Sequence, residues 1–356
     1  MPLINLLIIE DEPAQIQMYA DVIEQFNKKN SIQFSYNLCK SFNEGVEALK
    51  SPSFDAAIID LKLSNSEKLE GRDLVISVYQ KIRVPVFVYS GSIAQIDDIP
   101  ENVLLRKKLR TEKLTTILNE VIEIYKTGIT SFLRPNGLID QKLTEIFWNH
   151  LSKDLNVWIK HNNPETLLRY ILAHFQEYLE IDTDGDFQEY HPNEIYISPP
   201  IKKNLHTGDL IKIENQYYII LTPACDIVFN YKKNEKGEEM SFRKANKMLL
   251  VSTDEFDYKK LCMNKEGKLD KNKLSNYVKN GTFQYHYLPP FKTDNGFLID
   301  FQNLKSIDFT IPHERVATIS SPFIKDIISR FANYYSRQGQ PTFRQDELIE
   351  YLFKKG

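Results

Sequence analysis

Four short apolar runs in the first 107 residues each end in polar residues, and this pattern constrains the fold more than any other feature. Such runs, separated by segments of helical period, are typical of buried parallel strands. The run at 5–9 precedes Glu10 and Asp11, that at 56–59 precedes Asp60, that at 86–89 precedes Ser90, and that at 103–106 precedes Lys107. In an open parallel sheet, binding groups collect outside the carboxyl ends of the strands. We therefore expect these side chains to meet in one crevice.

The segments between the runs predict the rest of a doubly wound α/β domain. The alternation over 32–36 predicts a further strand, and helical periodicity covers 14–28, the 40s, the 70s and 111–125. This predicts five parallel strands with helices on both faces of the sheet. The segment from Ser90 to Pro100 has only Ile93 and Ile96 for an apolar face, so its helix should be short or irregular.

The expected crevice suits transfer of a phosphoryl group to an aspartate. Mg2+ prefers oxygen ligands, which the carboxylates of Glu10, Asp11 and Asp60 and the backbone carbonyl of Lys62 would supply. Asp60 would be the nucleophile, while the hydroxyl of Ser90 and the ammonium of Lys107 would neutralise the phosphoryl oxygens. The alternative is that these residues are merely solvated charges in loops. That alternative could account for any one of the residues, but it accounts poorly for all five at the ends of strands.

These motifs resemble a known family. Residues 1–126 are similar to the CheY-like receiver domain of bacterial two-component response regulators, in IIEDEP, AAIIDLKL, VFVYSG and LLRKK. The resemblance implies a flavodoxin-like fold, Mg2+ as cofactor, and phosphorylation of Asp60 by a sensor histidine kinase or a phosphotransfer protein. Leu114 lies seven residues beyond Lys107, which suits the family and favours Lys107 over Lys108.

The sequence also departs from the family pattern. Lys108 follows Lys107 where the family usually has proline, and Leu104 stands at the family's aromatic switch position. Tyr89 should point to the other side of its strand from Ser90, so it is a poor substitute for that ring. Acceptance of phosphate is therefore better supported than switching of an output.

The remaining two thirds of the chain predict a helical bridge over 127–182 and an α+β output domain over 183–356. Apolar residues at helical spacing fill 138–160 and the stretch after Pro164, two helices that pack on the domain behind them or dimerise. Strand patterns around a turn at Glu214 and Asn215 predict a hairpin. The stretch from Gly208 to Ile227 resembles the start of a small β-barrel in poorly characterised bacterial proteins.

Three functions compete for the output domain, which we expect not to be an enzyme apart from self-dephosphorylation of the acyl phosphate. The first is binding of a downstream protein partner, or a phosphate sink similar to one component of Detocs-type antiviral defence systems. The second is an enzyme centred on Cys225, with His206 as the nearest base in sequence. The third is nucleic-acid binding by 231–280, which has an excess of five positive charges but no legible binding motif.

Composition excludes several other classes. The 42% hydrophobic content is enough for ordinary cores, and the formal net charge of -3 gives no pull towards nucleic acid or membrane. No apolar stretch approaches the roughly 20 residues of a membrane-spanning helix. The cysteines, Cys39, Cys225 and Cys262, are odd in number and far apart, which favours a reducing cytoplasm over a disulfide framework.

Overall fold

The structure is a computed structural model that describes residues 2–50, 54–63, 70–81, 83–160, 163–180, 185–186, 189–233, 239–337 and 344–355. It divides into two compact units, Met1–Gln188 and Glu189–Gly356. The predicted helical bridge therefore falls in the same unit as the N-terminal sheet.

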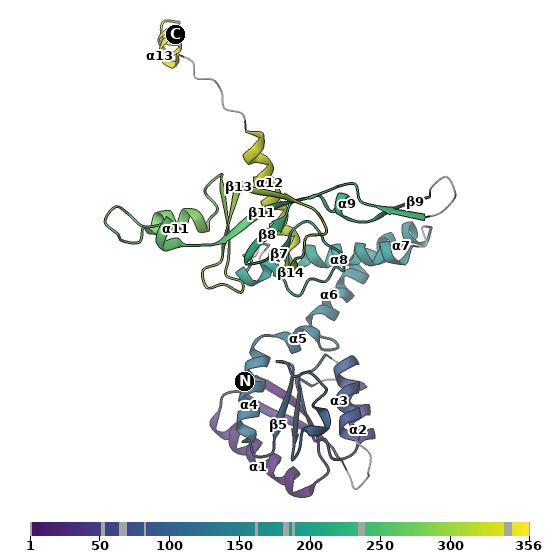
Figure 1. The fold of residues 1–356 in the computed structure, drawn as a ribbon. Coiled ribbons are helices and arrows are strands. Elements are labelled where there is room, and N and C mark those ends of the chain that lie inside the picture. Colours follow the sequence, from purple (N-terminus) through teal and green to yellow (C-terminus); the bar gives the residue numbers. More distant parts are fainter. Residues whose placement is uncertain are drawn as a thin grey trace. The chain divides into compact units, whose positions relative to one another are not determined.

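The N-terminal unit is built on a five-stranded sheet in which every neighbouring pair is parallel (Figure 1). Its strands are β1 (Leu3–Ile9), β2 (Gln33–Cys39), β3 (Ala56–Ile59), β4 (Val86–Ser90) and β5 (Leu105–Leu109). They lie in the order β2-β1-β3-β4-β5, which is the flavodoxin-like order of doubly wound sheets. The predicted fold class of this part is confirmed.

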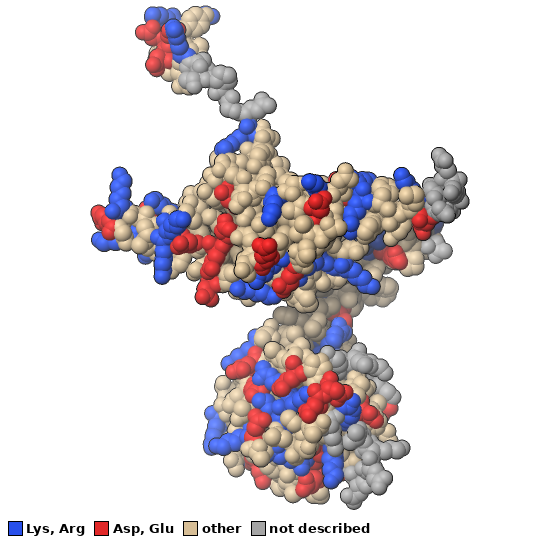
Figure 2. All heavy atoms as spheres, in the orientation of Figure 1, with Lys and Arg blue, Asp and Glu red and all other residues tan. Residues whose placement is uncertain are grey.

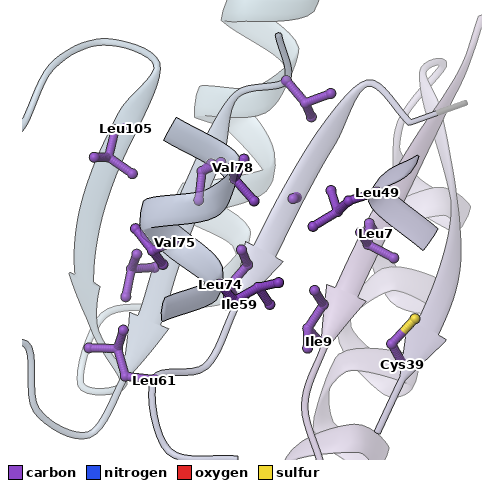
Figure 3. Close-up of a cluster of buried hydrophobic side chains, with 14 of the residues drawn as sticks. Leu7, Ile9, Cys39, Leu49, Ile59, Leu61, Leu74, Val75, Val78 and Leu105 are labelled. Atoms are coloured by element: carbon purple, nitrogen blue, oxygen red, sulfur yellow. The ribbon is translucent and has the colours of Figure 1, made fainter. Parts of the chain in front are cut away.

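Helices cover both faces of this sheet because its central strands, β1, β3 and β4, are apolar on both sides. They are α1 (Pro13–Lys29), α2 (Phe42–Lys50), α3 (Glu70–Lys81) and α4 (Leu114–Lys126). On one face, buried side chains of α2 and α3 such as Leu49 and Leu74 pack on Ile9 and Ile59 (Figure 3). On the other face, α1 and α4 bury a second cluster that includes Tyr19 and Ile117.

The helix expected between β4 and β5 is indeed short. Only a 3-10 turn, η1 (Ala94–Ile96), forms there, and it buries Ile96 completely. The polar run that follows, Asp97 and Asp98, carries no apolar side chain that could extend a buried helical face.

The last strand of the sheet starts and ends later than its sequence suggests. The side-chain carbonyl of Asn102 accepts hydrogen bonds from the backbone N–H groups of Leu104 and Leu105, at 2.8 Å and 3.0 Å. This turn delays the start of β5, so that Leu109 rather than Lys107 pairs with Ser90. Arg110 is consequently the first residue beyond the carboxyl end of the strand.

The bridge consists of helices that pack within the first unit. They are α5 (Ile129–Leu133), α6 (Leu138–Ile146), the π-helical turn η2 (Phe147–Leu151), α7 (Ser152–Ile159) and α8 (Pro164–Glu180). The side chain of His150 lies 2.9 Å from the hydroxyl of Tyr178, which ties η2 to α8. Arg134, just after α5, forms a 3.6 Å ion pair with Asp55 at the amino end of β3.

The second unit contains a curled, seven-stranded antiparallel sheet. Its strand order is β12-β13-β11-β8-β7-β14-β6. The strands are β6 (Tyr196–Ile197), β7 (Asp209–Ile213), β8 (Gln216–Ile220), β11 (Met248–Glu255), β12 (Tyr285–Leu288), β13 (Phe297–Ile307) and β14 (Glu314–Ile319). The predicted hairpin is present, since β7 and β8 pair around Glu214 and Asn215. This half-barrel confirms the predicted β-barrel-like part.

Smaller elements surround that sheet. A separate two-stranded sheet is formed by β9 (Asn230–Lys233) and β10 (Glu239–Phe242). The helices are η3 (Pro192–Ile195), α9 (Ala224–Ile227), α10 (Tyr258–Leu261), α11 (Lys271–Val278), α12 (Ser321–Ser336) and α13 (Gln345–Phe353). Side chains of α12, including the buried Ile327, pack against the core of the sheet. Among the described residues, no helix is long and apolar enough to span a membrane.

Candidate functional site

Three acidic residues converge at the carboxyl edge of the N-terminal sheet. Glu10 and Asp11 follow β1, and Asp60 follows β3, the strand that pairs with β1 through Ile9 and Ile59. One carboxylate oxygen of each of the three residues lies within 4.8 Å of the other two. Glu10 and Asp60 are almost completely buried, with 0% and 3% of their surfaces exposed. The predicted acidic cluster is thus assembled by the register of two neighbouring strands.

A glycine is required beside this cluster. Gly71, in the first turn of α3, lies so close to the end of β3 that an added Cβ would come within 2.4 Å of the carbonyl oxygen of Asp60. Any larger residue would push α3 away from the backbone that carries Asp60. The local sequence therefore helps to fix the position of the acidic side chain.

A pocket of about 240 Å3 opens over Asp60. Its lining includes Ser90 and Lys62, both predicted site residues, together with Gly91, Ser92, Glu12 and Arg110. Ser90 ends β4 and is buried, and its hydroxyl interacts with the Asp60 carboxylate. A cavity needs roughly 10–15 Å3 to hold one water molecule. This pocket is many times larger, so a phosphoryl group together with several waters would fit.

The cation in the site is Arg110. Its Nη2 atom lies 2.7 Å from Oε2 of Glu10 and 3.1 Å from Oδ2 of Asp60. Its Nη1 atom lies 2.8 Å from Oε2 of Glu12. Among the described residues, Arg110 is the cation that forms an ion pair with Asp60.

Lys107 does not meet Asp60, which corrects its expected placement. Because β5 ends at Leu109, Lys107 lies opposite Val88 in the middle of the strand. Its Nζ atom donates a 2.7 Å hydrogen bond to the backbone carbonyl of Ile96 in η1. The sequence pointed to Lys107 because it follows the run at 103–106, and the spacing to Leu114 favoured it over Lys108. Neither feature reveals where the strand ends.

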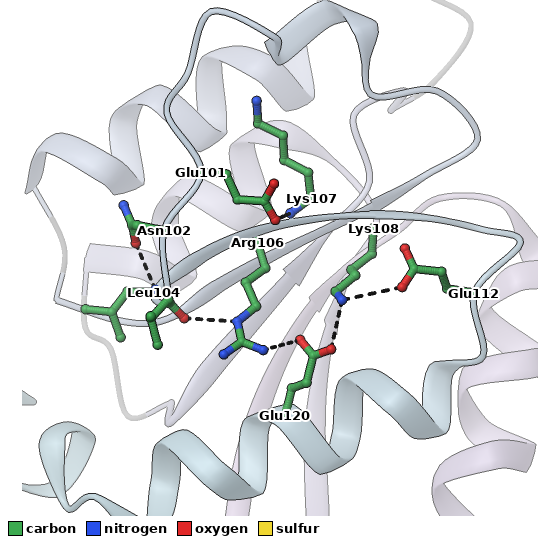
Figure 4. A network of polar contacts seen from close by, with 9 residues as sticks. Glu101, Asn102, Leu104, Arg106, Lys107, Lys108, Glu112 and Glu120 are labelled. Atoms are coloured by element: carbon green, nitrogen blue, oxygen red, sulfur yellow. Dashed lines mark hydrogen bonds and ion pairs between the residues drawn. The ribbon is translucent and has the colours of Figure 1, made fainter. Parts of the chain in front are cut away.

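The neighbouring cations of β5 point to the opposite face of the sheet, as alternation along a strand requires (Figure 4). Arg106 forms an ion pair with Glu120 of α4, and Lys108 lies 2.8 Å from the same carboxylate. These contacts hold α4 against the sheet. Lys108 is therefore engaged with α4 rather than with the acidic cluster.

Burial disfavours the charged forms of the carboxylates in the acidic cluster. It raises the pKa of Glu10 to about 7, and the charge of Asp60 acts in the same direction. Burial also raises the pKa of the Asp60 carboxyl, against the opposing effects of the Ser90 hydroxyl and Arg110. The Oδ1 atom of Asp60 is buried and has no hydrogen-bond partner in the described part of the chain. A buried oxygen without a hydrogen-bond partner is energetically costly, and contact with a cation or an electrophile would satisfy it.

The residues present fit a divalent cation with oxygen ligands. Glu10, Asp11 and Asp60 provide three carboxylates, and Lys62 lies in the wall of the same pocket, where its backbone carbonyl was expected to contribute. Mg2+ is commonly held by a few carboxylates and retained waters. The unpartnered Oδ1 of Asp60 is consistent with this set.

The residue at the family's switch position lies outside the site. Leu104 precedes β5 and is 41% exposed. Tyr89 is buried on the α1 and α4 face of the sheet, where its hydroxyl donates a 2.7 Å hydrogen bond to the backbone carbonyl of Glu112. Tyr89 therefore points away from the side of β4 that carries Ser90, as expected from alternation.

The two alternative sites in the second unit gain no support. Cys225 is exposed, and its thiol lies 3.4 Å from Asp226, while the contacts of His206 within the described residues are to Thr207 and Asp209. The alternative of a Cys225 nucleophile paired with His206 is thus not favoured. In the view of Figure 2, acidic side chains are interspersed among the basic ones of this unit, so that face shows no continuous positive surface.

The fold and the site define the first unit as a doubly wound α/β domain with a cluster of three carboxylates at the carboxyl edge of its sheet. Its structure is similar to those of response-regulator receiver domains, over the N-terminal third of this chain. One is the N-terminal domain of a response regulator/sensory box/GGDEF protein from Carboxydothermus hydrogenoformans, at 15% identity and a TM-score of 0.28, covering 35% of this chain and 98% of that one.

Two further similar structures are the receiver domain of Erythrobacter litoralis PhyR and the response regulator TrrA from Thermotoga maritima. The PhyR domain is 19% identical with a TM-score of 0.29, covering 35% of this chain and 92% of that one. TrrA, solved in complex with Mg2+ and BeF, is 10% identical with a TM-score of 0.28, covering 34% of this chain and 98% of that one. No protein-family profile and no curated protein matches the sequence.

Proposed function

We propose that the first unit accepts a phosphoryl group on Asp60 from a histidine kinase or a phosphotransfer protein. The observation that carries this proposal is the buried, unpartnered Oδ1 atom of Asp60 beneath an open pocket. Oδ1 attacks phosphorus, the bond from phosphorus to the donor imidazole breaks, and the imidazole leaves with the electron pair and takes up a proton. The product is an acyl phosphate on Asp60.

The other residues of the pocket stabilise the transferred group. Glu10, Asp11, Asp60 and the backbone carbonyl of Lys62 would hold Mg2+, which supplies charge neutralisation at the phosphoryl oxygens when bound. Ser90 lies beside the carboxylate and donates its hydroxyl hydrogen to a phosphoryl oxygen. Arg110, rather than Lys107, is the side chain within reach that adds a fixed positive charge.

The output of this reaction is proposed to be protein binding. A protein partner reads the phosphorylated first unit, or the unit drains phosphate from the kinase, as in the Detocs-type systems that the sequence resembles. The position of Leu104 outside the pocket, and the single turn in place of a helix before β5, suit a phosphate acceptor with little conformational switching. The second unit is proposed to act without enzymatic chemistry of its own.

The test is phosphorylation of the full chain by acetyl phosphate with Mg2+, followed by intact-mass measurement. We expect the wild type to gain the mass of one phosphoryl group and Asp60→Asn to gain none. Asp55→Asn is the matched control, since Asp55 is a buried carboxylate at the other end of the same strand. The proposal fails if Asp60→Asn is still labelled, or if folded wild type takes no phosphate from either acetyl phosphate or a histidine kinase.

A further inference from the structure

Arg110 occupies the same carboxylates that would hold the metal. Its Nη2 atom bridges Glu10 and Asp60, at 2.7 Å and 3.1 Å, and these are two of the three members of the acidic cluster. Its Nη1 atom is held by Glu12, which lies outside that cluster and is about half exposed. One guanidinium nitrogen, Nη1, thus contacts the half-exposed Glu12, while the other, Nη2, contacts the buried Glu10 and Asp60.

Glu10 has no unused oxygen in this arrangement. Its Oε1 atom accepts a 3.1 Å hydrogen bond from the backbone N–H of Glu12, and its Oε2 atom is the one that contacts Arg110. Asp60 differs, because its Oδ2 atom contacts Arg110 while Oδ1 has no hydrogen-bond partner among the described residues. A cation could therefore bind Asp60 through Oδ1, whereas at Glu10 it would have to share an oxygen that already has a partner.

Two physical effects set the guanidinium and the metal in competition. Mg2+ demands near-octahedral geometry with oxygens at about 2.0–2.1 Å, so a ligating carboxylate oxygen must turn a lone pair towards it. A guanidinium bound to the same oxygen competes for its lone pairs and restricts how the carboxylate can turn. The two cations would also lie a few ångströms apart in a buried site, where like charges repel more strongly than in water.

From this geometry, and resting on the proposed function, we propose that Arg110 is an internal competitor of the metal. In the resting unit it neutralises Glu10 and Asp60, and loading of Mg2+ requires Nη2 to leave them. The contact with Glu12 keeps the freed guanidinium at the wall of the pocket, which Arg110 and Glu12 both line. Because coupling between two bound groups is reciprocal, Arg110 sets the affinity of the site for Mg2+.

The proposal is tested by calorimetric titration of Mg2+ into the full chain without any phosphoryl donor. We expect Arg110→Gln to bind Mg2+ roughly tenfold more tightly than the wild type, within the range usual for coupled sites. Lys107→Gln is the matched control, since it removes the same charge from the same segment but leaves the ion pairs of Arg110 intact. We expect it to change the affinity by less than about twofold, because Lys107 contacts Ile96 and is not among the residues that line the pocket over Asp60.

An equal or weaker affinity in Arg110→Gln would overturn the proposal, and so would an equally large effect of Lys107→Gln. A second measurement guards against a misfolded variant. In the wild type, the Nε–H nuclear magnetic resonance signal of Arg110 should shift along the same titration curve that calorimetry gives. Binding of Mg2+ with no change in that signal would also refute competition.

Failure of this proposal is distinguishable from failure of the proposed function. The titration uses no phosphoryl donor, so continued labelling of Asp60→Asn would remove the function and leave the competition result standing. Conversely, labelling of Asp60 with unchanged Mg2+ affinity in Arg110→Gln would leave the acceptor role intact and remove Arg110 as competitor.

Discussion

Replacing Glu10 by glutamine should stabilise the first unit at neutral and higher pH. The residue is fully buried, and burial raises its pKa from 4.5 to about 7. The folded state therefore binds the proton more tightly than the unfolded state does. The contribution of Glu10 to the free energy of unfolding is therefore greatest below pH 4.5 and is lost as pH rises through about 7, because folding then increasingly requires a buried charge.

The size of this effect follows from the shift. One pKa unit corresponds to 1.36 kcal/mol, so a rise from 4.5 to about 7 costs the wild type about 3 kcal/mol at pH 8 and about 1 kcal/mol at pH 5. Glutamine stays neutral and can still accept the hydrogen bond from the backbone N–H of Glu12. The variant should therefore gain about 3 kcal/mol at pH 8 and much less at pH 5.

Hydrogen exchange of the β1 and β3 amides in the full chain, with chelator present, measures this difference within the unit concerned. Glu24→Gln is the control, because Glu24 is an exposed carboxylate of α1 whose surface pair with Lys28 contributes little. We expect that variant to stay within about 0.5 kcal/mol of the wild type. The reasoning is refuted if Glu10→Gln is no more stable than the wild type at pH 8, or if its advantage is the same at pH 5.

Two further predictions concern the second unit, and urea unfolding checks both. Burial and the nearby Arg330 lower the pKa of His286 to about 3. The free energy of unfolding should therefore fall by about 2 kcal/mol between pH 7 and pH 5, because the unfolded chain takes up a proton that the folded chain does not. His286→Gln should abolish this pH dependence, and a dependence that persists would exclude His286 as its source. Arg315 lies 2.7 Å from the fully buried Asp209, so Arg315→Met should cost at least about 3 kcal/mol, and adding Asp209→Asn should recover part of the loss. No recovery in that double variant would show that packing, rather than the stranded charge, dominates.

The sequence was sufficient for the sheet because its apolar runs are short, continuous and separated by helix-period segments. Strands buried on both faces must be apolar throughout, which makes them legible without structure. The positions of Glu10 and Asp60 follow from this, since a residue directly after a parallel strand has to lie at the carboxyl edge of the sheet. The short helical turn before β5 was also predictable, because Ile93 and Ile96 are too few to form the apolar face of a longer helix.

The sequence was insufficient to predict where β5 begins and ends. Four of the five residues from Arg106 to Arg110 are cations, so hydrophobicity gives no sharp end to the strand. The turn at Asn102 sets where β5 begins, and pairing with β4 sets where it ends. A shift in strand register changes which side chain faces the site, and this is why Arg110 was missed.

The sequence by itself determined a doubly wound sheet and the acidic residues at its edge, because both follow from local patterns of apolar and polar residues. The tertiary structure alone decided that Arg110 pairs with Glu10 and Asp60, and that Asp209 is buried against Arg315. Those ion pairs join residues 50, 100 and 106 positions apart. Which charges meet over such separations depends on strand register and packing, and no local pattern encodes either.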